Sequence, residues 1–174
     1  MGKGVIIAAI AVVAVVAVGA VVFLLPNEKS AYDLLPDVGS FPDYWTCTDK
    51  EAIDSSGLDN IKSMAAGAYI GPGSVKMTVF IQVFDSADTA KDELSGLRAF
   101  SSTWSPTDSK YFANGFEFTN AVGTFHFFQY KNVVGWLELE NGSLSSDPAN
   151  DEWGRIMSDI GDKINSSKKL FGIL

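Results

Sequence analysis

An uninterrupted apolar run near the N-terminus is the strongest constraint in this sequence. Between Gly4 and Leu25 every residue is Gly, Ala, Val, Ile, Leu or Phe. As a helix rising about 1.5 Å per residue, the run would extend roughly 33 Å, enough to cross a hydrocarbon core of about 30 Å. A helix also satisfies every backbone polar group inside the bilayer. We therefore predict that residues 1–25 are a transmembrane signal anchor in contact with membrane lipid.

The charges that flank this run predict its orientation. Only Lys3 precedes it, whereas one basic and three acidic residues follow it within 28–37. Basic flanks stay in the cytoplasm, so we predict a single-pass protein of the cell membrane with a cytoplasmic N-terminus and an outside C-terminal domain. The small residues 18–20 could also form a cleavage site. Five more apolar residues follow that site, which favours a retained anchor.

The remaining residues, 26–174, are enough for one domain with a substantial core. We predict a juxtamembrane connector over 26–43, rich in Pro and Gly, and an extracytoplasmic domain over 44–174. The formal net charge of the chain is −8, and no Lys/Arg cluster offsets it locally. This charge argues against a nucleic-acid partner and against anionic lipid headgroups. Cys47 is the single cysteine, so an intramolecular disulfide is excluded.

Alternating apolar residues predict six or seven short strands, mostly joined as hairpins. The Asn114-Gly115 dipeptide is typical of a tight hairpin turn, here joining 110–113 to 116–120. The expected strands are 44–48, 61–70, 75–84, 110–113, 116–120, 124–130 and 133–140.

Two segments have helical periodicity instead. Ser86 is a good N-cap for a helix over 87–99, and Asp147 with Pro148 predicts the start of a final helix. That helix has an apolar stripe at Trp153, Ile156, Met157, Ile160 and Ile164. The predicted fold class is α+β, an antiparallel sheet with two helices packed on one face, preceded by one transmembrane helix.

Motifs that carry chemistry are sparse. His126 is the single histidine and lies within an aromatic strand, and no zinc-site or phosphate-loop spacing is present. Glu138 and Glu140 alternate on one strand face and could act as paired carboxylates, although a solvated face explains them as well. We therefore expect no catalytic residue, no cofactor and no metal.

One strand, 124–130, is aromatic on both faces. Because one helix layer covers one face, we expect Phe128 and Tyr130 to form a binding face together with Trp136 on the adjoining strand. A protein or a small molecule could occupy it, although loops could also cover it. Separately, Asn141 and Asn165 begin glycosylation sequons on the predicted outside.

The layout resembles the membrane-tethered extracytoplasmic domains common in archaea and bacteria. An apolar anchor is followed by a strand, an acidic cap and an Ala-rich helix (80–97), then by a late hairpin and a terminal helix. Lys3-Gly4 is similar to the end of a type IV pilin-like leader. However, Ala8 and Ala9 stand where pilins typically carry a glutamate, and Pro26 stops the helix.

The first resemblance implies a binding, sensing or accessory module rather than an enzyme. A structural subunit of a surface assembly is the second hypothesis, and a hydrolase the third.

The predicted orientation has a direct test. Protease added to intact cells or spheroplasts should digest the domain that follows Pro26, because that domain faces outward. Protection of the domain until the membrane is lysed would contradict the orientation.

Overall fold

A computed structural model describes residues 29–166. The predicted membrane span and the sequence that precedes it lie outside these residues. Within 29–166, no helix is long and apolar enough to cross a bilayer.

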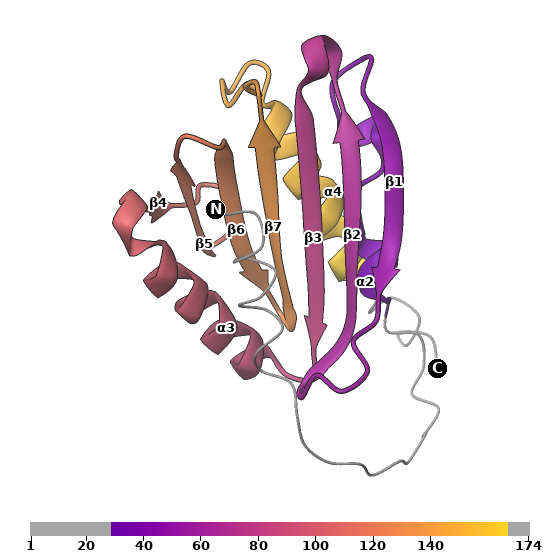
Figure 1. Cartoon of the computed structure of the whole chain (residues 1–174), viewed down its shortest axis with the longest axis vertical. Helices are drawn as coiled ribbons and strands as arrows, with labels where there is room; N and C mark the ends of the chain where they lie inside the picture. The colour runs from indigo at the N-terminus through magenta and orange to yellow at the C-terminus, as the bar shows by residue number, and fades with distance from the viewer. Residues whose placement is uncertain (1–28, 167–174) are drawn as a thin grey trace.

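The described residues form one seven-stranded antiparallel sheet with helices, which confirms the α+β class (Figure 1). Its strands in spatial order are β1 (Thr46–Ile53), β2 (Ile61–Ile70), β3 (Lys76–Phe84), β7 (Val133–Glu140), β6 (Thr124–Tyr130), β5 (Asn114–Thr119) and β4 (Thr107–Asp108). The α-helices are α2 (Ala31–Leu34), α3 (Ala87–Phe100) and α4 (Glu152–Ser166), and short 3-10 turns cover Val38–Ser40, Pro72–Ser74 and Ser101–Trp104.

The first three strands in the sequence start at one edge of the sheet, and the last four start at the opposite edge, so that the two groups meet in the middle. Strands β1 to β3 form a meander, after which α3 carries the chain to the far edge at β4. Strands β5 and β6 then return by hairpins until β7 pairs with β3, with Ile81 opposite Gly135. The hairpin predictions over 61–84 and 124–140 are confirmed by this pairing.

The main core lies between the sheet and α4. The predicted stripe of α4 is buried, with Ile156 and Ile160 fully inaccessible to solvent. These side chains pack with alternate residues of β3, including Val79 and Ile81, and with Leu137 of β7. In this layer, apolar residues spaced at the 3.6-residue period of the helix pack against alternate residues of the strands.

The second helix covers the other face of the sheet, so the prediction that both helices share one face is wrong (Figure 1). Leu94 of α3 packs with Phe116, Phe118 and Phe127, while Ala90 packs with Val134. None of these residues belongs to the cluster beneath α4. Strands β3, β6 and β7 carry large apolar side chains on both faces, and each face needs its own cover.

Residues expected to form a separate connector contribute to the core. Ala31, Leu34, Leu35 and Phe41 are buried in the cluster that contains α4. Phe41 stacks on Tyr69 with 4.4 Å between ring centroids. This segment therefore packs into the same core as α4, because the short helix α2, capped by Ser30, and its C-cap Leu35 place two leucines in that cluster.

The final helix begins later than predicted. Asp147 forms a turn, in which its carboxylate accepts from Ala149 N at 2.9 Å. Asp151 takes the capping position instead, accepting from Gly154 N at 3.0 Å. An aspartate stabilises a turn as readily as a helix start, so the sequence offers two candidate caps four residues apart.

The Asn114-Gly115 dipeptide is not a hairpin turn. Both residues lie within β5, which pairs with β6, and β4 takes the edge position predicted for 110–113. A Cβ atom at position 115 would lie 2.7 Å from Phe127 O and 3.0 Å from Ser109 Cβ. The glycine is thus explained by close packing of the backbone rather than by a turn.

We expect Ile160→Ala to lower the free energy of unfolding by roughly 2–5 kcal/mol, because it removes a fully buried side chain and leaves a cavity. Asp162→Ala, on the exposed side of the same helix, should change it by less than about 0.5 kcal/mol. Chemical denaturation of the two variants would measure both. Equal losses would contradict this assignment of the helix faces.

Candidate functional site

The three residues of the predicted binding face do not lie together. Phe128 is fully buried beneath α4, and Tyr130 lies on the same face of β6, close to the end of α4. Trp136 lies on the α3 face, opposite Phe127 on the neighbouring strand. Its ring stacks on Phe80 with centroids 4.2 Å apart.

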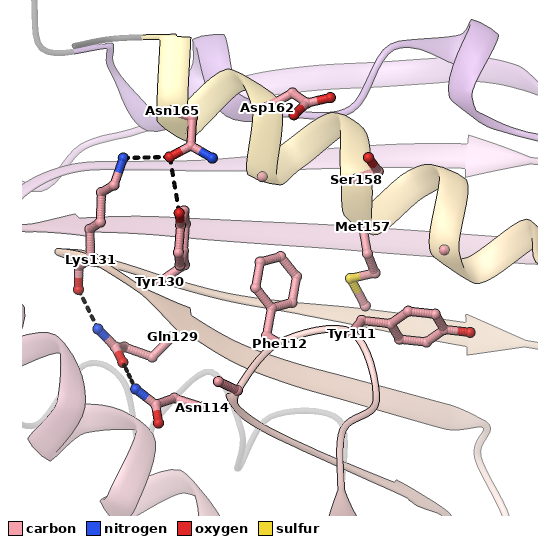
Figure 2. Close-up of a pocket in the computed structure, with 13 residues that line it drawn as sticks. Tyr111, Phe112, Asn114, Gln129, Tyr130, Lys131, Met157, Ser158, Asp162 and Asn165 are labelled. Carbon is pink, nitrogen blue, oxygen red and sulfur yellow. Dashed lines mark hydrogen bonds between the residues drawn. The ribbon is translucent and has the colours of Figure 1, made fainter.

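A groove of about 520 Å³ runs along α4, and Tyr130 is the one predicted face residue that lines it (Figure 2). One wall is α4 between Gly154 and Asn165. The opposite wall is the segment 111–114 together with the end of β6. On this side α4 contributes Gly154, Ser158 and Gly161, which have little or no side chain. The space beside Gly154 is taken by the Asp151 carboxylate, so the groove is most open along Gly161.

The floor of the groove is apolar. Phe112 projects from the loop before β5 toward α4, and Met157 reaches down from the helix (Figure 2). The Phe112 ring stacks on buried Phe128, with centroids 4.5 Å apart. A Cβ atom at Gly161 would lie 3.9 Å from that ring, an ordinary contact distance. The floor is therefore anchored in the main core.

Polar groups converge at one end of the groove. The Asn165 side-chain oxygen accepts from Lys131 Nζ at 2.7 Å and from Tyr130 Oη at 3.0 Å. These two donors fix the orientation of the amide and leave its nitrogen turned away from Lys131 (Figure 2). The Lys131 ammonium also lies 5.2 Å from the centroid of the Tyr130 ring.

A second chain of amides supports this end from the sheet. Asn114 donates to the Gln129 side-chain oxygen at 2.8 Å, and the Gln129 amide nitrogen donates to the Lys131 carbonyl (Figure 2). Gln129 itself is buried. These bonds hold the tight β6–β7 turn, where Lys131 has a positive φ of 55°.

A smaller cleft of about 300 Å³ lies on the other side of Tyr111 and contains His126. His126 is 4% exposed and packs on Trp153 of α4, with ring centroids 4.0 Å apart. Glu117 Oε2 lies 3.0 Å from its Nδ1, but without the alignment of a hydrogen bond. Burial, and then the positive charge of Lys110, lowers the pKa of His126 to about 4.

Two other ionisable groups of this cleft, Tyr111 and Lys110, are engaged by Asp151. Tyr111 Oη donates to Asp151 Oδ1 at 2.8 Å, and burial with this bond raises the pKa of Tyr111. Lys110 Nζ lies 3.7 Å from Asp151 Oδ2 and donates to the Ser146 carbonyl. Burial raises the pKa of Glu117, an effect that Lys110 opposes. The cleft therefore holds a neutral imidazole next to Glu117, while Lys110 and Tyr111 interact with Asp151.

Neither space has the ligands of a metal centre. Within 29–166, no three His, Cys, Asp or Glu side chains are grouped closely enough to hold an ion. Glu138 and Glu140 share a face of β7 and line neither space. Burial, and then the charge of Glu140, raises the pKa of Glu138.

The two sequons occupy different settings. Asn141 is exposed in the loop after β7, with a positive φ of 59°. Asn165 lies in the last turn of α4 and lines the groove.

Sequence reasoning missed most of the groove. The strand pattern places Phe112 within the predicted strand 110–113 and Lys131 between the predicted strands 124–130 and 133–140, and neither position is marked as part of a site. The missed signal is a second set of residues on one side of α4. Gly154, Ser158 and Gly161 follow an i, i+4, i+7 pattern beside the apolar stripe. Small residues at that spacing mark a helix side that packs closely or leaves a space.

The fold is similar to that of a solved structure, the extracellular domain of PknH from Mycobacterium tuberculosis. The TM-score is 0.57 at 12% sequence identity, and the match covers 76% of this chain and 93% of that chain. No protein-family model and no curated protein matches the sequence. This likeness concerns the fold alone.

The buried imidazole predicts a pH dependence of stability. The folded state keeps His126 neutral down to about pH 4, whereas the unfolded chain binds a proton near pH 6.5, so stability falls as the pH drops through this window. A pKa difference of that size corresponds to about 3 kcal/mol. Urea unfolding at a series of pH values should show this loss in the parent protein and not in His126→Gln. Parallel pH profiles would contradict the assignment.

Proposed function

We propose that this chain is a membrane-anchored, extracytoplasmic binding module whose ligand occupies the groove beside α4. The observation that carries the proposal is the combination in one groove of an apolar floor and a convergent polar end. Binding sites for small ligands typically have this composition, with few polar groups placed to orient the ligand. The floor residue Phe112 and the polar residues Lys131 and Asn165 come from three separate elements.

The anchor and the outward orientation rest on the apolar run and on its flanking charges. The similarity to a domain described as extracellular supports this location through the fold. Of the two sequons, Asn141 is the better acceptor site, because it is exposed in a loop. A glycan on Asn165 would instead occupy the groove.

A hydrolase is the second candidate, favoured by the contact of Glu117 with His126 inside a cleft. A neutral imidazole can act as a general base. However, the Tyr111 hydroxyl beside it donates a hydrogen bond to Asp151, and no hydrogen bond joins a nucleophile to His126 within 29–166. A structural subunit of a surface assembly is the third candidate, for which the groove gives no specific support.

The binding proposal can be tested with the full chain in detergent micelles. Saturation-transfer NMR would use three soluble probes, namely glycerol 3-phosphate, diacetylchitobiose and trialanine. We expect at least one probe to bind, and Gly161→Phe to weaken its affinity by about tenfold, or about 1.4 kcal/mol, by filling the groove.

Gly96→Phe is the matched control, because Gly96 lies on α3 with open space around it. It should leave probe binding unchanged. The proposal would be wrong if none of the probes bound, or if both phenylalanine variants bound the probe as the parent does.

A further inference from the structure

The polar end of the groove lies where the chain enters and leaves the described domain. Lys29, the first described residue, donates from Nζ to Ser166 Oγ at 2.7 Å. Ser166 follows Asn165, which lines the groove. The β6–β7 turn is at the same end, because Lys131 contacts Asn165. Any anchor that precedes Lys29 therefore attaches beside this end of the groove.

The distance to the bilayer is short if the predicted span ends at Leu25. Residues 26–28 alone separate the span from Lys29, and an extended chain covers at most about 3.6 Å per residue. Lys29 then lies within about 14 Å of the hydrocarbon edge, where the headgroup layer is itself roughly 5–8 Å thick. The polar end of the groove is thereby held at or just above the lipid headgroups.

This end presents hydrogen-bond donors to an anionic group. Within the described residues, no carboxylate pairs with the Lys131 ammonium, whose contacts are Asn165 Oδ1 and the Tyr130 ring. The Asn165 amide oxygen is occupied by two donors, so both hydrogens of its nitrogen are available to a ligand. An ammonium and an amide N–H close together suit the oxygens of a phosphate.

A free carboxylate stands one helical turn farther from the anchor. Asp162 lines the groove and is exposed. No hydrogen bond or ion pair within 29–166 engages it. It lies three residues before Asn165, a spacing that separates side chains on one helix face by about 5–6 Å. The wall of the groove therefore offers donors for an anion at Lys131 and Asn165, and an acceptor for a cation at Asp162, three residues earlier on α4.

We propose that the groove binds the zwitterionic headgroup of an aminophospholipid in the surrounding bilayer. The phosphate contacts Lys131 Nζ and Asn165 Nδ2, and the primary ammonium donates to Asp162. In such a headgroup the two charges are roughly 4–5 Å apart at ordinary bond lengths, close to the spacing on the helix. The phosphate is also the group nearer the hydrocarbon, as Asn165 is nearer the anchor.

The overall charge of the protein favours the same choice. A chain with a net charge of −8 repels an anionic lipid at long range, whereas a zwitterion has no net charge to repel. A trimethylated headgroup also has no N–H to donate to Asp162, so a primary amine is the expected form. This inference rests on the proposed function, since it names the ligand of the same groove.

The test uses the full chain in phosphatidylcholine nanodiscs, alone or with phosphatidylethanolamine or phosphatidylglycerol added. Hydrogen–deuterium exchange is followed in the β6–β7 turn and in the last turn of α4. We expect severalfold slower exchange with phosphatidylethanolamine than with either other composition. Asp162→Asn and Lys131→Gln should each abolish that difference. Asp92→Asn, at an exposed position on α3, should retain it.

Three results would overturn the proposal. They are equal exchange in all three lipids, equal protection by phosphatidylglycerol and phosphatidylethanolamine, and protection that survives Asp162→Asn. Soluble phosphoethanolamine is added to the phosphatidylcholine discs as a further arm. If it alone gave the full protection, a free metabolite rather than a lipid would be the ligand. If the lipids gave no difference while Gly161→Phe still removed binding of a soluble probe, the binding function would stand and only the lipid assignment would fail.

Discussion

The fold depends on a central pair of strands that is apolar on both faces. In β3, Val79 and Ile81 point toward α4, while Phe80 points toward the α3 side with Trp136 of β7. Burying only one of these faces would leave the other in water, at a cost of about 25 cal/mol for each Å² of apolar surface exposed. The chain meets this requirement with two helices. Helix α3 lies between β3 and β4 in the sequence and covers one face, and α4 follows β7 and covers the other.

The groove results from the way in which α4 covers its apolar face of the sheet. Its large residues occupy one stripe against the sheet, and Ile156 and Ile160 have no surface left for a ligand. The adjoining stripe of Gly154, Ser158 and Gly161 faces the loop before β5, which supplies Phe112. Packing on the first stripe fixes the helix, so the second stripe keeps its shape without having to be filled. A preorganised space of this kind costs little ordering entropy on binding.

Much of the local structure could be predicted from the sequence, since hydrophobic period and capping act over a few residues. The helix after Ser86 and the buried stripe at Ile160 are examples. The side of the sheet that each helix covers could not be predicted. The hydrophobic periodicity of a helix shows that it has an apolar face, but not which face of the sheet that apolar face packs against. Trp136 was grouped with Phe128 for the same reason, since only the strand register shows that its neighbour is Phe127. The polar end of the groove joins Lys131 to Asn165 across 34 residues, and no local pattern connects them.

The groove and the His126 cleft lie at different positions along β6, and this separation has an electrostatic consequence. Tyr130 and His126 are four residues apart on this strand, or about 13 Å at 3.3 Å per residue. That is about one and a half Debye lengths at physiological ionic strength. In the orientation proposed for the anchored chain, Lys131 lies at the end of β6 that is nearer the bilayer surface, and His126 lies farther from it along the same strand. Lipid composition would then act first on the ions that surround the groove, whereas the buried histidine would respond to the pH of the bulk medium.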